Sequence, residues 1–150
     1  MTRQSVTLTL SEKDYRQLLL LTFLGEWMVN AIRKDPDPAV EDAASHLYSF
    51  TRGTPLEALA GFDGAHHLWL PSEKLELEAH ALIDEYDDET FWEELTARLV
   101  ERDLISQYGE RAVKSMHPEQ RSRAAKPIAQ AYTHEFEERG LDRLFVSEEN

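Results

Sequence analysis

The stretch SEKDYRQLLLLTFLGEWMVNAIRK, residues 11–34, decides the fold predicted for this chain. Ser11 is a favourable helix N-cap residue, and Glu12 and Asp14 follow in the first turn, where acidic side chains interact well with the helix dipole. Apolar residues then cover much more than one helical stripe. A helix that is apolar on nearly all sides packs against several neighbours. We therefore expect this helix at the centre of the domain.

Further helices are predicted because proline and glycine separate segments that have helical apolar spacing. Pro36 disfavours a helical Asp35, so the first helix ends before it. The short connection to Pro38 predicts an antiparallel pair of helices. Pro127 lies inside the last predicted helix and is expected to kink or split it. Beyond the first helix, helices are expected over 38–52, from Ser72 to about Tyr86, from Asp87 or Asp88 to at least Val100, over 110–116 and over 118–139.

Two short segments near the chain ends have the pattern of strands. VTLTL, residues 6–10, alternates apolar residues with threonine, which is the period of a half-buried strand. LDRLFV, residues 141–146, has a similar character. We expect the two segments to pair and to join the ends of the domain. FDG at 62–64 predicts a turn, and the residues after it, 66–71, are expected to be extended.

These patterns together predict a mainly α protein. We expect a single-domain bundle over residues 1–150, with about five longer helices around the central apolar helix at 11–34. A small two-stranded β ribbon is expected to join the N- and C-terminal segments. At 150 residues a chain is long enough to bury a sizeable core in one domain.

Composition excludes several classes of function. The absence of cysteine removes disulfides, thiolate nucleophiles and cysteine-ligated metal sites. The 29 acidic residues outnumber 16 Lys and Arg, which gives a formal net charge of −13. Such a charge disfavours both nucleic acid and anionic membranes as partners. No signal-peptide pattern and no apolar run of 18 residues is present, so we expect a cytoplasmic protein.

No motif in the sequence specifies a reaction. The acidic stretch 73–95 fails the EF-hand pattern, because the required glycine and acidic positions hold other residues. Acidic pairs three residues apart are no more frequent than so acidic a composition produces by chance. The nucleophile elbow, the P-loop and the dinucleotide-binding glycine motif are all missing. No cofactor is predicted, and an enzyme is not favoured.

Histidines four residues from acids motivate an alternative hypothesis of a metal-dependent hydrolase or metal-binding bundle. Asp42 and His46 share one helix face, as do His80 and Asp84. A divalent metal between facing helices would use these four side chains. The spacing is weakly specific, because roughly half of the histidines in so acidic a chain would have an acid at such a position by chance.

Glu26 stands in an otherwise apolar run and is the most distinctive candidate for ligand binding. It shares a narrow polar stripe with Thr22, Asn30 and Arg33, at helical spacings of four, four and three. Trp27 lies beside it. Either the stripe is the solvated edge of a packed helix, or Glu26 is a partly buried carboxylate that faces a cavity. Gly25 is costly inside a helix, so a neighbouring group is expected to approach the backbone there.

The best hypothesis for function is an acidic helical binding or scaffolding module that self-associates or binds another protein. Its motivation is a set of large aromatic residues without any catalytic motif, since aromatic side chains are enriched at interfaces. These residues are Trp27, Trp69, Trp92 and Tyr108. The candidate ligand-binding residues are Glu26, Trp27, Asn30 and Arg33, and the metal ligands of the alternative are Asp42, His46, His80 and Asp84.

Overall fold

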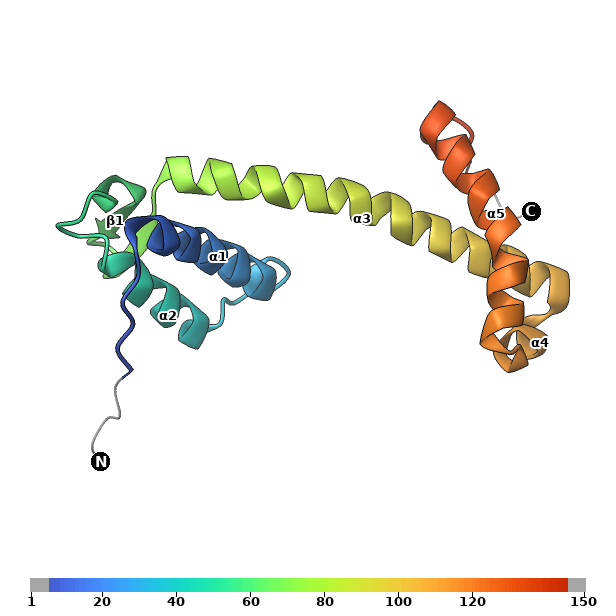
Figure 1. Ribbon diagram of the computed structural model, residues 1–150, viewed down its shortest axis with the longest axis horizontal. Coiled ribbons are helices and arrows are strands. Elements are labelled where there is room, and N and C mark those ends of the chain that lie inside the picture. The colour runs from blue at the N-terminus through green and yellow to red at the C-terminus, as the bar shows by residue number, and fades with distance from the viewer. Residues whose placement is uncertain (1–5, 146–150) are drawn as a thin grey trace. The chain divides into compact units, whose positions relative to one another are not determined.

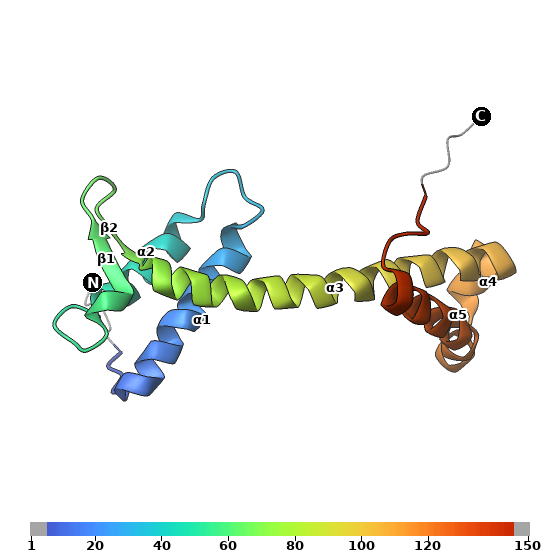
Figure 2. The same ribbon diagram turned by 90° about the horizontal axis from the view of Figure 1, so that it is seen from above.

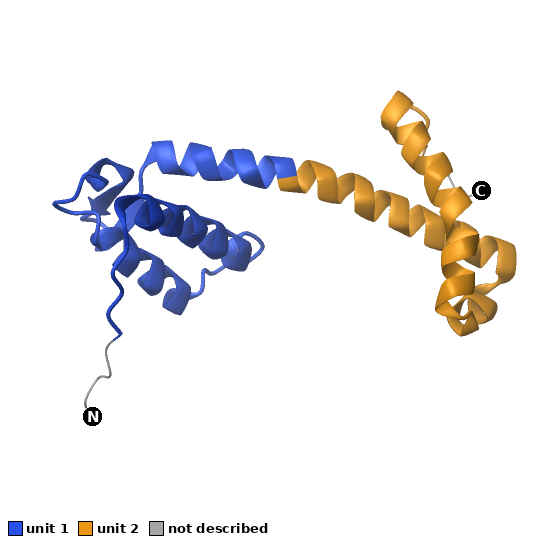
Figure 3. Cartoon of the chain, in the orientation of Figure 1, with its two compact units in different colours: residues 1–85 blue, residues 86–150 orange. Residues whose placement is uncertain are grey.

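A computed structural model describes residues 6–145. The chain forms two compact units, unit 1 over Met1–Glu85 and unit 2 over Tyr86–Asn150 (Figure 3). The protein is mainly α, as predicted. That all 150 residues form one globular domain stays a prediction. No helix in the described part of the chain is long and apolar enough to cross a membrane.

Unit 1 consists of helices with a β-hairpin at one end of the unit (Figure 1). Ser11 is the N-cap of the first helix and accepts a hydrogen bond from the Asp14 backbone N–H, as the sequence predicts. Asp37 is the N-cap of the second helix, with Pro38 at its first position. The elements are α1 (Glu12–Asn30), α2 (Pro38–Ser49), the 3₁₀ turn η1 (Glu57–Leu59), β1 (Ala60–Asp63), β2 (Leu68–Pro71) and the first part of α3 (Glu73–Tyr108).

The core of unit 1 joins three helices. Leu19 of α1, Tyr48 of α2 and Leu75 of α3 are buried in one cluster. Seen from above, α1 crosses the first turns of α3 (Figure 2). Arg16 of α1 forms an ion pair with Glu78 of α3 at this crossing, with both side chains about one-third exposed. The apolar cluster therefore holds the helices together, and a partly exposed ion pair adds little to it.

The β-hairpin is the sheet of unit 1. Ala60 pairs with Pro71 and Asp63 with Leu68 in antiparallel register. The Trp69 backbone N–H donates a hydrogen bond to the Ser45 hydroxyl at 2.8 Å, which fastens the hairpin to α2. The predicted turn is displaced, because Phe62 and Asp63 belong to β1 and the turn comprises residues 64–67. Of the segment expected to be extended, 66–71, residues 68–71 form the strand β2.

The expected ribbon between the chain ends is wrong. The two-stranded sheet consists of β1 and β2, and neither residues 6–10 nor residues 141–145 form a strand. Val146, the last residue of the second predicted segment, lies outside the described residues. Period-2 spacing shows that a segment suits a sheet but does not identify the segment that pairs with it. The hairpin forms because its strands are adjacent in the sequence.

Unit 2 contains the rest of α3 and two further helices. Gly109, with a φ of 83°, ends α3 and leads into α4 (Glu110–Ser115), and α5 (Pro118–Arg139) follows. Its buried residues are Val100, Leu104 and Val113, against which one face of α5 packs. The predicted bounds of the last two helices are confirmed, and α5 continues through Pro127.

The predicted break between a third and a fourth helix is wrong, because α3 is one helix of 36 residues. The prediction read Asp87 or Asp88 as a new N-cap. Aspartate inside a helix costs less than 1 kcal/mol relative to alanine, roughly, and no glycine or proline interrupts residues 73–108. The helix therefore passes through both aspartates.

One face of α1 is uncovered in the described part of unit 1. Leu21 is 62% exposed and Met28 is 60% exposed. The expectation that neighbours pack on several sides of this helix is therefore not met. Gly25 lies on the same exposed face, and a methyl group added to it would meet no atom within 4 Å. The expected close approach to the Gly25 backbone is absent as well.

We predict that Gly25→Ala stabilises the isolated protein. Alanine restricts the unfolded chain, and the space around the new methyl group is open. The free energy of unfolding should rise by about 0.5–1 kcal/mol, measured by urea denaturation. A loss of stability would show that another group occupies this helix face in solution.

Candidate functional site

Glu26 lies on α1 and is half-buried. Burial raises the pKa of its carboxyl group, and the negative charge of Glu41 on the neighbouring helix raises it further. No hydrogen bond or ion pair within residues 6–145 satisfies this carboxylate. Glu26 is thus neither fully solvated nor paired with a cation.

The other residues of the polar stripe bond to backbone groups. The Thr22 hydroxyl donates to the Leu18 carbonyl at 2.7 Å, and the Arg33 Nε donates to the Val29 carbonyl at 2.7 Å. The Asn30 side-chain oxygen accepts a hydrogen bond from the Asp37 N–H at 2.9 Å. Asn30 therefore orders the α1–α2 connection and does not pair with Glu26. Trp27 is half-buried beside the stripe.

Tyr48 is a core residue of unit 1 that carries a polar group, and sequence reasoning missed it. Its side chain is fully buried, and its hydroxyl has no hydrogen-bond partner among the described residues. Burial raises the pKa of this phenol, and the charges of Glu26 and Glu76 raise it further. The sequence could have indicated that Tyr48 is buried, because it lies four residues after Ala44 and so on the same helix face. These two are the buried residues of α2.

The residues of the alternative metal site do not come together. Asp42, His46, His80 and Asp84 are all exposed. The His46 ring packs edge-on against Phe50, and the His80 ring packs against Phe23 and hydrogen-bonds to the Glu76 carbonyl. In residues 6–145 no group of three His, Asp or Glu side chains is arranged to hold a metal ion.

Unit 1 has an apolar groove of about 710 Å³ beside its N-terminal segment. The segment before α1 borders this groove, and α1 and α2 supply much of its wall. The apolar or aromatic residues that line it include Val6, Leu8, Leu10, Tyr15, Leu18, Leu47, Phe50 and Leu56.

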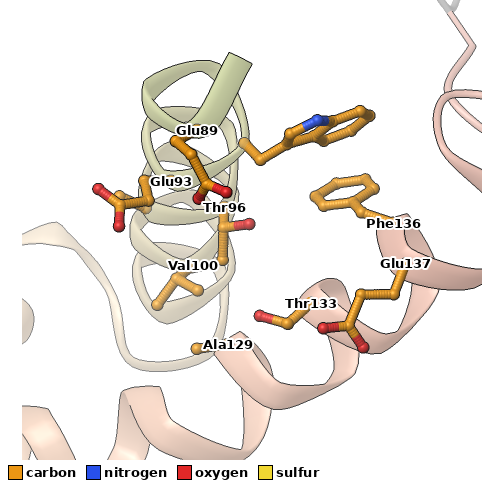
Figure 4. Close-up of a pocket in the computed structure, with 10 residues that line it drawn as sticks. Glu89, Glu93, Thr96, Val100, Ala129, Thr133, Phe136 and Glu137 are labelled. Atoms are coloured by element: carbon orange, nitrogen blue, oxygen red, sulfur yellow. The ribbon is translucent and has the colours of Figure 1, made fainter. Parts of the chain in front are cut away.

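Unit 2 has a second groove, of about 610 Å³, between α3 and α5 (Figure 4). Trp92 and Phe136 form its aromatic wall, with ring centroids 5.4 Å apart. Its other lining residues are polar or small, and they are Glu89, Glu93, Thr96, Ala97, Val100, Ala129, Thr133 and Glu137. Neither groove was predicted, because each joins residues that are distant in the sequence.

Compared with known proteins, the chain matches no protein-family model, no curated protein and no solved structure.

We predict that Tyr48→Phe leaves the protein at least as stable as the wild type. The change removes a buried hydroxyl that lacks a partner and keeps the ring in the core. The free energy of unfolding should increase by about 1 kcal/mol, since an unsatisfied buried hydroxyl costs roughly 1–3 kcal/mol. Thermal and urea denaturation measure it. A clear loss of stability would mean that the hydroxyl is bonded in solution.

Glu26→Gln should give a stability gain that depends on pH. The folded state binds the Glu26 proton more tightly than the unfolded state, so the wild type loses stability as pH rises from the ordinary glutamate value of 4.5 through the raised pKa. Glutamine stays neutral throughout. The variant should therefore match the wild type below this window and exceed it above, by less than about 1 kcal/mol.

The control for Glu26→Gln is Glu85→Gln, which removes one exposed carboxylate from the same acidic protein. Urea denaturation of both variants from pH 4 to pH 8 separates a local effect from the loss of net charge. Identical curves for the two variants would contradict the role of burial at Glu26.

Proposed function

We propose that this chain is a protein-binding module. It associates with a second copy of itself through the exposed apolar segment at residues 6–10 and the adjoining groove of unit 1. One observation carries the proposal. Val6, Leu8 and Leu10 are 88%, 71% and 44% exposed. In the described structure, residues 6–10 form no backbone hydrogen bond with any other segment. An extended apolar segment with unpaired backbone groups is a template for pairing with another chain.

The pattern of the segment favours a second copy as partner. In a paired strand alternate side chains share one face, so pairing of residues 6–10 would place Val6, Leu8 and Leu10 on one face and Thr7 and Thr9 on the other. Antiparallel pairing of two copies about Leu8 places Val6 of each copy across from Leu10 of the other. Such pairing satisfies the backbone groups and aligns apolar side chains across the two strands.

The groove of unit 1 supports the same proposal. Its apolar walls adjoin the segment, so a partner strand would cover side chains such as Leu47 and Phe50 as well as residues 6–10. Apolar area removed from water on association stabilises the complex. The net charge of −13 opposes contact between two copies, and salt screens that repulsion.

The metal-dependent hydrolase has no comparable support. Its four candidate ligands are exposed, and within residues 6–145 no three His, Asp or Glu side chains are arranged to hold a metal ion. Glu26 is half-buried, but no described nucleophile or base is bonded to it. We therefore favour a binding function over an enzymatic one.

The test is light scattering of the full chain at micromolar concentrations. The wild type should have twice the mass of one chain, and Leu8→Asp should shift it to the mass of a monomer, because a carboxylate would enter the apolar face. Thr9→Asp adds the same charge on the opposite face and should leave the dimer intact.

Added salt should strengthen the wild-type dimer. A wild type that stays monomeric at every concentration and salt level would overturn the proposed self-association. Equal dissociation of both variants would show that charge alone, and not the apolar face, controls it.

A further inference from the structure

The groove of unit 2 is distinguished by carboxylates that lack cations. Glu89, Glu93 and Glu137 line it, and none of them forms an ion pair or hydrogen bond within residues 6–145. No Lys or Arg lines the groove. Figure 4 shows Glu89 and Glu93 on the α3 side and Glu137 on the α5 side. The groove therefore presents negative charge from both of its walls.

Some other glutamates on these two helices do have cations beside them. Glu94 pairs with Arg98, Glu101 with Arg121, and Glu135 with Arg139. Moreover, residues 86–97 contain five acidic residues and no basic one. Carboxylates without a paired cation thus line the groove, and charge complementarity selects a cationic occupant.

The aromatic wall of the groove indicates which kind of cationic side chain would bind there. Trp92 and Phe136 are half-buried, and their rings contact each other in a tilted arrangement. Aromatic faces attract cations, and tryptophan attracts them most strongly. A planar guanidinium stacks on an aromatic ring and also donates paired hydrogen bonds to carboxylates, whereas an ammonium group acts as a point charge. These surfaces together favour arginine over lysine.

The length of the groove favours a peptide over a small ion. Glu89 and Val100 lie near its two ends on α3, and 11 residues of helix span about 16 Å. An extended peptide of about five residues has that length. Val100, Ala97 and Ala129 supply apolar surface along the groove, on which the aliphatic part of an arginine side chain packs.

We propose that the groove between α3 and α5 binds an arginine-bearing extended segment of a partner protein. The apolar parts of that segment lie along Trp92 and Phe136, and its guanidinium groups reach Glu93 and Glu137. This binding surface lies in unit 2 and is separate from the apolar surface proposed for self-association.

The probe is a fluorescent peptide of alternating arginine and alanine, added to the full-length protein and followed by fluorescence anisotropy. The double variant Glu93→Gln/Glu137→Gln should weaken binding about tenfold or more, because it removes one lining carboxylate from each of the two helices. The lysine peptide of the same length should bind more weakly than the arginine peptide.

The chain supplies a matched control from the same two helices. Asp88→Asn/Glu138→Gln removes the same charge from exposed side chains that do not line the groove. It should change binding by less than about threefold, as expected for loss of a general field. Equal weakening by both double variants would overturn the proposal, as would a wild type that does not bind the arginine peptide.

A second measurement places the peptide without relying on variants. The protein has three tryptophans, so its indole N–H signals in an NMR spectrum are few and assignable. The Trp92 signal should shift on titration, and the Trp27 and Trp69 signals should not. Spermidine at the same charge concentration should compete poorly, and competition equal to that of the peptide would contradict recognition of a polypeptide segment.

Discussion

Unit 1 depends on one packing arrangement, the burial of Leu19, Tyr48 and Leu75 from three helices in a single cluster. A compact unit of about 85 residues covers a smaller fraction of its surface than a 150-residue domain would. This explains why α1 is covered on one side while Leu21 and Met28 remain exposed on the other. The apolar character of α1 exceeds what its own unit buries.

The same packing sets the electrostatics of the unit. The buried Tyr48 hydroxyl has no hydrogen-bond partner among the described residues. Burial and the negative charges of Glu26 and Glu76 raise the pKa of this phenol. Glu26 in turn loses part of its water shell against the same core, which raises its pKa. The acidic residue that stood out in the sequence is therefore unusual because of its half-buried position, and not because of a catalytic partner.

The sequence predicts those parts of the fold that depend on local chemistry. Ser11 and Pro38 locate two helix starts, Gly140 follows the last helix, and Gly64 lies in the turn of the hairpin, two residues later than the start of the predicted turn. Prediction from the sequence fails where the structure depends on contacts between distant residues, or where a possible N-cap residue does not end the preceding helix. The strand-like segment at 6–10 has no partner in the described chain, and Asp88 does not interrupt α3.

The grooves follow the same division between local and distant information. Trp92 and the acids around it are visible in the sequence, but Phe136 and Glu137 come from a helix more than 40 residues away. Only the packing of α5 against α3 brings the second wall into place. The metal hypothesis used local information alone. Helical spacing grouped side chains within each helix, but the fold leaves all four of them exposed.

The two proposed surfaces differ in how the acidic character of the chain acts on them. At residues 6–10 the driving force is burial of apolar side chains, and the like charge of two copies works against it. At the groove of unit 2 the unpaired carboxylates supply the attraction, and salt screens it. A net charge of −13 thus disfavours one association and favours the other. Ionic strength would shift the balance between self-association and capture of a basic segment, because it moves the two free energies of binding in opposite directions.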